Sequence, residues 1–205
     1  TVYGGLDILY QREETTTNNL ETVEILNTSI KYASDNSFDT SVSDAKVKAL
    51  EASKKYKKIS EYALYNGESI RKAITELFGD IKYVDSGSTN NHNFIYDYIY
   101  DSDNDVYLVK RNNNDSQKNT NQGINYKLLS TKEKDEKVIV TIAIAYTYKD
   151  DSNTMYAKDS EGEKIIAENV EEFPEDKIDE FDKFEITLKK SSDNKYVFES
   201  IKKVK

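Results

Sequence analysis

Three aspartates at alternate positions have the spacing of calcium ligands. Asp101, Asp103 and Asp105 match the opening of a calcium-binding loop, in which alternate side-chain oxygens converge on one ion. The rest of the loop does not match, because Val106 replaces the glycine of the sharp turn and Asn112 replaces the bidentate glutamate. Asp, Asn and Ser are also the usual residues of tight turns. We therefore expect a hairpin turn without a metal, and a metal site at these three aspartates is the alternative.

A row of aromatic residues could bind a ligand. The tyrosines concerned alternate along two segments that have the period of β-strands: Tyr96, Tyr98, Tyr100, Tyr146 and Tyr148. Facing solvent, their rings and hydroxyl groups would form a stacking surface for sugars or other flat ligands. Facing the interior, they would be core residues. Asp97 lies on the opposite side of the first strand, which favours the core for the tyrosines.

The net charge of -9 comes from one part of the chain. Residues 159–182, which we call the acidic segment, contain eleven Asp and Glu and two Lys, and the acidic and basic residues elsewhere balance. The segment could bind divalent cations or a basic partner. Charged runs are more often solvated surface, and we expect a loop or short helix around Pro174.

Four lysines surround Tyr56, namely Lys54, Lys55, Lys57 and Lys58. Such a cluster could attract anionic polymers, membrane headgroups or nucleic acid. An isoelectric point of about 4.8 and the presence of only three arginines argue against nucleic acid. We expect a solvated helix face with Tyr56 buried, and the alternative is that the lysines meet the acidic segment.

The composition excludes several chemistries. The chain has no cysteine, which rules out disulfides, thiolate nucleophiles and thiolate zinc sites. The single histidine, His92, lies among asparagines and is expected in an exposed loop. The sequence contains no phosphate-binding loop, dinucleotide-binding motif or zinc-protease motif, and we expect no cofactor. No apolar run approaches the roughly 20 residues of a membrane-spanning helix.

The first eighty residues predict helices. Apolar residues recur at helical spacing in three stretches, residues 20–33, 45–63 and 69–78. Ser43 or Asp44 would cap the second helix, Gly67 would separate it from the third, and Gly79 would end the third. The second helix carries small alanines, so we expect it to lie close to a neighbouring element.

From residue 81 onward the period changes to two, which predicts strands. The predicted strands are residues 94–100, 106–111, 137–149, 184–190 and 196–204, with a polar loop at 112–123. Residues 137–149 carry large side chains on one face and alanines on the other, as in a central strand covered on both sides. We expect the alanine-rich helix at residues 49–63 to cover the alanine face.

Helices followed by antiparallel strands indicate the α+β class. The expected arrangement is a set of N-terminal helices packed on a curved, mainly antiparallel C-terminal β-sheet. We assign residues 41–205 to an α+β domain and residues 1–40 to an N-terminal helical extension of the same domain.

The closing hairpin resembles the terminal strand pair of many exported proteins of low-GC Gram-positive bacteria. The resemblance covers residues 184–205, FEITLKKSSDNKYVFESIKKVK. Several such proteins adopt the cone-like fold of the nuclear transport factor and ketosteroid isomerase superfamily. The resemblance implies an exported protein, either secreted or held at the extracellular face of the membrane by an anchor, and it carries over no catalytic residue. In the isomerases a carboxylate and tyrosines transfer protons inside the cone, and Asp97 with Tyr96 and Tyr98 is similar to that set in residue types.

We therefore expect a non-catalytic extracytoplasmic binding domain. Its partner would be a protein or a cell-envelope polymer, and a start at Thr1 is consistent with an export signal or membrane anchor upstream. The alternative is a small-molecule-binding or lyase- or isomerase-like cone, with Asp97 and the neighbouring tyrosines in its cavity. That function requires Asp97 to be buried with a raised pKa.

Overall fold

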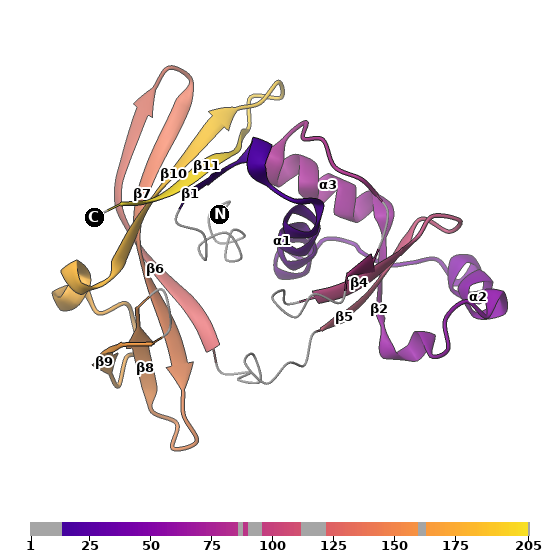
Figure 1. Cartoon of the computed structure of the whole chain (residues 1–205), viewed down its shortest axis with the longest axis horizontal. Coiled ribbons are helices and arrows are strands. Elements are labelled where there is room, and N and C mark those ends of the chain that lie inside the picture. Colours follow the sequence, from indigo (N-terminus) through magenta and orange to yellow (C-terminus); the bar gives the residue numbers. More distant parts are fainter. Residues whose placement is uncertain (1–13, 86–87, 90–95, 112–121, 160–162, 205) are drawn as a thin grey trace. The chain divides into compact units, whose positions relative to one another are not determined.

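The computed structural model describes residues 14–204 apart from residues 86–87, 90–95, 112–121 and 160–162. Its α-helices precede residue 79, and most of the later described chain is antiparallel strand (Figure 1). The predicted α+β class is confirmed.

The chain divides into two compact units, which are described separately. The sheet unit comprises Thr1–Leu20 and Lys118–Lys205, and the helix–sheet unit comprises Glu21–Gln117. The boundary predicted between residues 40 and 41 falls inside the helix–sheet unit, because the helices on both sides of it belong to that unit.

The described part of the helix–sheet unit combines three α-helices with a four-stranded antiparallel sheet. Its elements are α1 (Thr22–Asp35), α2 (Asp44–Ser53), the 3₁₀ helix η4 (Ile59–Glu61), β2 (Ala63–Asn66), α3 (Gly67–Phe78), β3 (Ser88–Thr89), β4 (Tyr96–Asp101) and β5 (Val106–Arg111). The strand order is β2-β5-β4-β3. Helices α1 and α3 lie on one side of this sheet and α2 lies on the other (Figure 1).

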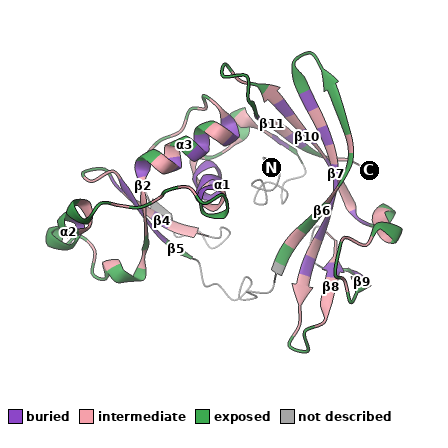
Figure 2. Cartoon of the chain, turned by 180° about the vertical axis from the view of Figure 1, so that it is seen from behind, coloured by how far each residue is buried: buried purple, intermediate pink, exposed green. Residues whose placement is uncertain are grey.

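Helices α1 and α3 confirm two of the three predicted helices. The buried stripe of α3 has the predicted spacing and consists of Ile70, Ala73, Ile74, Leu77 and Phe78 (Figure 2). The side chain of Asn66 caps α3 by accepting a hydrogen bond from the backbone N–H of Ser69 at 2.8 Å. Gly79 ends the helix with a positive φ of 69°, which glycine adopts readily. Glu21 and Glu24 form a capping box at the start of α1.

The predicted helix over residues 45–63 is wrong beyond Ser53. Helix α2 ends at Lys54, whose φ of 52° lies in the left-handed region. The chain then forms an irregular loop, η4 and β2. Tyr56 lies in that loop, where its hydroxyl group donates a hydrogen bond to Asp101 at 2.8 Å. The later apolar residues Tyr56 and Ile59 therefore pack against the Leu50 cluster from an irregular segment and 3₁₀ turn, and not from a continuous helix.

The alanines of α2 do not form a close packing face. The three of them, Ala45, Ala49 and Ala52, are all exposed. Leu50 is the buried residue of this helix, and it packs in a cluster with Val106 and Leu108 of β5. Helix α2 therefore covers one face of the four-stranded sheet through a single aliphatic anchor.

The described part of the sheet unit is a seven-stranded sheet. Its elements are β1 (Glu14–Thr16), the 3₁₀ helix η3 (Thr17–Asn19), β6 (Gln122–Lys134), β7 (Lys137–Lys149), β8 (Met155–Lys158), β9 (Ile165–Glu168), the 3₁₀ helix η6 (Glu175–Glu180), β10 (Asp182–Lys190) and β11 (Tyr196–Val204). The order is β1-β11-β10-β7-β8-β9, and β6 also pairs with β7. Strands β7, β10 and β11 confirm the predictions, whereas β6, β8 and β9 were missed.

The alanine face of β7 is covered by the acidic segment. Ala143 and Ala145 are fully buried in a cluster with Ile166 and Phe181. Further apolar residues of the segment pack around them: Ala167, Val170, Phe173 and Ile178. The predicted cover by the helix at residues 49–63 is wrong, because large apolar side chains within the acidic segment fill the space above the alanines. The segment therefore has an apolar inner side and a charged outer side.

Candidate functional site

The β4–β5 hairpin confirms the predicted turn, and its first aspartate is buried. Asp101 is 2% exposed. Its carboxylate accepts hydrogen bonds from the Tyr56 hydroxyl group at 2.8 Å and from the backbone and side-chain N–H groups of Asn104 at 3.0 and 2.9 Å. Burial raises the pKa of Asp101, but these hydrogen bonds outweigh it and hold the pKa below the ordinary 3.8. Asp101 thus ties the loop after α2 to the turn.

The other two aspartates of the alternative metal site have different partners. Lys55 forms an ion pair with Asp103, and Arg71 of α3 forms one with Asp105. In the part of the chain that the structure describes, no group of three or more His, Cys, Asp and Glu residues is arranged to hold a metal ion. Asp101, Asp103 and Asp105 are therefore not brought together as ligands.

Arg71 and Asp105 form a bidentate ion pair. The guanidinium group donates from Nη1 to Oδ1 at 2.8 Å and from Nη2 to Oδ2 at 2.6 Å. The Tyr100 hydroxyl group also donates to Asp105, at 2.9 Å, and a carboxylate oxygen of Asp85 lies 3.5 Å from Arg71. The hydrogen bonds from Arg71 lower the pKa of Asp105, and those to Asp105 raise the pKa of Arg71. Both side chains are therefore charged at neutral pH.

Gly67 makes room for this ion pair. Its backbone N–H donates to the carbonyl oxygen of Asp105 at 2.9 Å. A Cβ atom at this position would lie 1.9 Å from Oδ1 of Asp105 and 2.9 Å from Nη1 of Arg71. The predicted role of Gly67 as a separator between two helices is wrong, because Gly67 is the first residue of α3. A residue without a side chain is needed here because Asp105 of the hairpin turn lies close to the backbone of Gly67.

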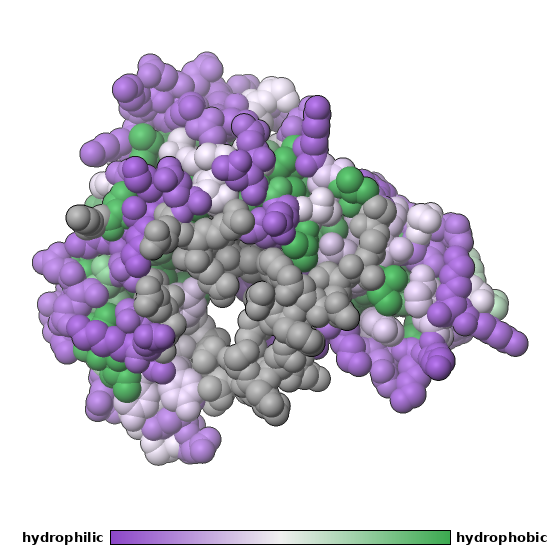
Figure 3. Space-filling view, viewed as in Figure 1, coloured by the Kyte–Doolittle hydropathy of each residue, from purple (hydrophilic) through white to green (hydrophobic). Residues whose placement is uncertain are grey.

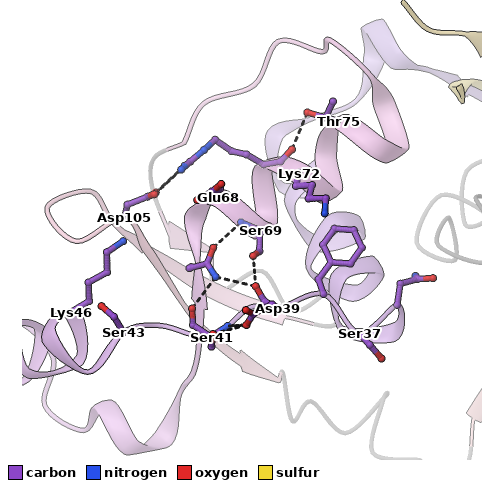
Figure 4. Close-up of a pocket in the computed structure, with 14 residues that line it drawn as sticks. Ser37, Asp39, Ser41, Ser43, Lys46, Glu68, Ser69, Lys72, Thr75 and Asp105 are labelled. Atoms are coloured by element: carbon purple, nitrogen blue, oxygen red, sulfur yellow. Dashed lines mark hydrogen bonds and ion pairs between the residues drawn. The ribbon is translucent and has the colours of Figure 1, made fainter. Parts of the chain in front are cut away.

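A polar groove of about 990 Å³ opens beside the ion pair (Figure 4). Half of its lining residues carry hydroxyl or amide side chains: Asn36, Ser37, Ser41, Ser43, Asn66, Ser69 and Thr75. Three more are basic and three are acidic, so their formal charges cancel: Lys46, Arg71 and Lys72, and Asp39, Glu68 and Asp105. Phe38 is the aromatic residue of the lining. Most ligand pockets are predominantly apolar, so this groove suits a hydrated ligand.

Asn66 holds the groove in shape. Its side-chain amide donates to the carbonyl oxygens of Asp39 and Ser41 at 3.1 and 2.9 Å, while its carbonyl oxygen caps α3 (Figure 4). The backbone N–H of Asn66 donates to Thr40 at 3.0 Å. One residue therefore fastens the 39–41 loop to the start of α3, and the groove is formed before a ligand arrives.

Several polar groups of the groove are available to a ligand. In the described part of the chain, the side chains of Ser37, Ser43 and Glu68 make no hydrogen bond with the protein. The ammonium group of Lys72 lies 5.3 Å above the centre of the Phe38 ring. The hydroxyl groups and Glu68 can thus exchange water for ligand hydrogen bonds without breaking protein contacts.

The predicted tyrosines are divided between the two units. Tyr96, Tyr98 and Tyr100 lie on β4 of the helix–sheet unit, whereas Tyr146 and Tyr148 lie on β7 of the sheet unit. Tyr98 is buried at 4% exposure, and burial raises the pKa of its hydroxyl group. In the other sheet Tyr148 stacks on the ring of Tyr156 at 6.3 Å, with Lys158 above it. Phe94, the first residue of the predicted strand over residues 94–100, lies outside the described residues.

Asp97 does not share a face with its neighbouring tyrosines. It pairs with Lys110 in the regular ladder between β4 and β5, and successive side chains of a strand point to opposite faces. Asp97 is also absent from the lining of the polar groove. The structure therefore does not assemble Asp97, Tyr96 and Tyr98 into one proton-transfer set.

The lysine cluster forms short-range ion pairs. Lys58 lies 3.0 Å from Glu61, and Lys55 contacts Asp103 and lies 3.8 Å from Asp101. These partners belong to the helix–sheet unit and not to the acidic segment. His92, the single histidine, lies outside the described residues.

The sequence interpretation missed Arg71 and Asn66 as site residues. Arg71 had a detectable signal, because it is one of three arginines in a lysine-rich chain and an arginine can bind a carboxylate in a bidentate manner. Asn66 immediately before Gly67 had the signal of a helix cap. The third helix was predicted to begin at residue 69 with Gly67 as a separator before it, so the cap was not recognised, because α3 in fact begins at Gly67.

Comparisons of the chain with protein-family models, with curated proteins and with solved structures found no match. Within the described ranges, no helix combines the length and the apolar character needed to cross a membrane.

Proposed function

We propose that the protein is a non-catalytic binding domain whose polar groove holds a neutral, hydroxyl-rich polymer of the polysaccharide class. The observation that carries this proposal is the lining of the groove, in which hydroxyl and amide side chains predominate and the formal charges cancel. A neutral polyol needs both donors and acceptors, and the free hydroxyl groups, Lys46 and Glu68 supply them.

The ionisable groups around the groove support binding without catalysis. Hydrogen bonds from Ser41 lower the pKa of Asp39, and those from Arg71 lower the pKa of Asp105. A general acid at neutral pH requires a carboxyl group whose pKa is raised, and these two carboxylates are shifted in the opposite direction. Both are suited to fixing the shape of the groove.

We also propose that the domain works outside the cytoplasm, held there by a membrane anchor, with a cell-envelope polysaccharide as its ligand. The support for this location is the resemblance of residues 184–205 to exported proteins. Fractionation of cells that express the tagged full-length protein tests it. Recovery of the protein in the cytosolic fraction alone would contradict the location without affecting the groove.

A glycan array tests the binding function. We expect the labelled protein to bind to immobilised neutral glycans on the array. Ser43→Ala with Glu68→Ala should weaken this binding roughly tenfold, because two hydrogen bonds to the ligand are lost. These side chains make no hydrogen bond with the described protein, so the fold is preserved. Ser192→Ala with Glu163→Ala, on the sheet unit, is the matched control. The proposal would be contradicted if the protein bound no neutral glycan on the array. It would also be contradicted if the groove variant and the control variant bound neutral glycans equally well.

A further inference from the structure

Strand β6 presents a long sheet edge. It has 13 residues and pairs with β7, and among the described residues no second strand pairs with it. The strands at the two ends of the sheet, β1 and β9, have only three and four residues. In an antiparallel pair, alternate residues of an edge strand turn their N–H and C=O groups outward. β6 therefore offers a row of main-chain donors and acceptors to another extended chain.

Exposed apolar side chains are concentrated on this strand. Tyr126, Leu128 and Leu129 are 37%, 48% and 37% exposed, although the visible surface in Figure 3 is largely hydrophilic. The ladder shifts register between Leu128 and Ser130, so two neighbouring leucines reach the surface at this bulge. Such a concentration on an edge strand marks a site of contact with another chain.

A cavity of about 420 Å³ lies between β6 and the acidic segment, and we call it the edge cavity. Residues 124–126 of β6 form one side, and Glu171, Glu172 and Phe173 form the other. Within the described chain, the carboxylates of Glu171 and Glu172 make no hydrogen bond or ion pair. Phe173 is fixed from behind by the ring of Phe181 at 5.1 Å. The cavity therefore combines aromatic walls with two free negative charges.

We propose that the β6 edge binds an extended basic peptide segment of a protein partner by strand addition. Alternate Lys or Arg side chains of that segment enter the edge cavity beside Glu171 and Glu172, with their aliphatic stems against Tyr126 and Phe173. Apolar residues of the peptide lie on Leu128 and Leu129. The edge supplies affinity through main-chain hydrogen bonds, and the carboxylates select the charge.

Charge complementarity favours this occupant over a second copy of the chain. The acidic segment carries the entire net charge of -9, and its outer residues Glu168, Glu171 and Glu172 are exposed. Pairing of two β6 edges would bring two such segments to one interface, where like charges repel. A basic peptide instead neutralises them.

Fluorescence anisotropy with synthetic peptides tests the proposal on the full chain. The probe is a labelled peptide of alternating Lys and Val. One control replaces every Lys with Glu, and a second carries N-methyl groups on alternate amides, which removes its strand hydrogen bonds. We expect saturable binding of the probe, at least tenfold weaker binding of the N-methylated peptide and no binding of the acidic peptide, as strand addition and charge selection require.

Matched protein variants locate the binding site. Glu171→Gln with Glu172→Gln should weaken probe binding roughly tenfold, as expected for the loss of two ion pairs. Glu163→Gln with Asp176→Asn also removes two charges from the acidic segment, at residues that do not line the edge cavity, and should change the affinity less than about threefold. Leu128→Ser with Leu129→Ser should weaken binding without altering the circular dichroism spectrum, because both side chains are exposed.

Three results would overturn the proposal. Equal losses in the two charge variants would show attraction to the whole segment and not to the edge cavity. Equal binding of the parent and N-methylated peptides would exclude strand addition. Self-association in analytical ultracentrifugation that the leucine variant abolishes, without peptide binding, would assign the edge to a second copy of the chain.

Discussion

Arg71 and Asp105 link three elements of the helix–sheet unit. The arginine comes from α3, the aspartate ends the hairpin turn, and the Tyr100 hydroxyl group donates to the same carboxylate from β4. Asp105 itself adopts a left-handed φ of 52°. The residue is held in this conformation by its hydrogen bonds, so the contact with Gly67 is sensitive to small changes.

Replacing Gly67 with alanine should destabilise the protein. Alanine normally stabilises a helix relative to glycine by about 1 kcal/mol. Here the new Cβ atom would displace a carboxylate that Arg71 fixes, so we expect a loss of about 1–3 kcal/mol in the free energy of unfolding, measured in urea. Gly123→Ala, at an exposed strand residue with a nearest contact of 3.1 Å, is the control and should be nearly neutral.

A double-mutant cycle identifies the cause of that loss. In the Asp105→Ala background the clashing side chain is absent, and Gly67→Ala should then be neutral or stabilising. An equal destabilisation by Gly67→Ala in both backgrounds would show that the clash with Asp105 is not responsible.

Acid should remove the stabilisation that Asp101 provides. Because its pKa in the folded protein lies below the ordinary 3.8, the ionised carboxylate stabilises the fold above that pH, and the effect disappears as the pH falls through the lowered value. In urea unfolding, Asp101→Asn should be less stable than wild type by about 1–3 kcal/mol near neutral pH, and the two should converge once the pH falls below the lowered pKa of Asp101. Tyr56→Phe, which loses one donor, should lie between them. Parallel pH profiles for wild type and Asp101→Asn would refute this role.

Local residue chemistry predicted the hairpin turn but not its partners. The Asp, Asn and Ser composition of residues 101–105 is sufficient for a turn. The contacts with Tyr56 and Arg71 lie 45 and 34 residues away in the chain, and no local pattern encodes them. For the same reason the sequence suggested a metal site, since it shows three carboxylates but not the cations that bind two of them.

At the scale of elements, strong periodicity was a reliable guide and weak periodicity was not. Strand β7 has the predicted bounds, because large side chains alternate with small ones over its whole length. Strand β6 was missed because its bulge places Leu128 next to Leu129 and breaks the alternation. The alanine spacing of α2 continued by chance beyond Ser53, where the left-handed Lys54 ends the helix.

Lys54→Gly distinguishes the observed end of α2 from the longer helix. At a left-handed position glycine relieves strain, and we expect the free energy of unfolding in urea to rise by about 0.5–1 kcal/mol. In the middle of a continuous helix the same change would lower it by about 1 kcal/mol. Lys57→Gly, three residues later and without a positive φ, is the control and should be neutral or slightly destabilising.

Phe181→Ala tests the packing of the acidic segment on β7. Phe181 is 4% exposed and lies over the alanine face, so we expect its truncation to lower the free energy of unfolding by about 3 kcal/mol. Ile165→Ala, at a residue of the same segment that is 48% exposed, should lower it by less than about 1 kcal/mol. Equal effects of the two variants in urea unfolding would mean that the segment does not cover β7.

At the scale of the whole molecule, two different kinds of surface belong to different units. The helix–sheet unit carries a groove whose formal charges cancel, and the sheet unit carries the acidic segment and the β6 edge. Composition could predict the charged surface, because the acidic residues are contiguous in the sequence. It could not predict the groove, whose lining comes from three separate stretches between residues 36 and 105.

The most direct test of groove binding is an NMR titration of the protein with a neutral oligosaccharide chosen from the glycan array, in which the amide chemical shifts are followed. Binding in the groove predicts shift changes confined to residues 36–46 and 66–75, which supply most of its lining. In the variant with Ser43→Ala and Glu68→Ala, the same changes should require a ligand concentration roughly tenfold higher. Shift changes centred on β6 or the acidic segment, or an unchanged titration midpoint in that variant, would contradict groove binding.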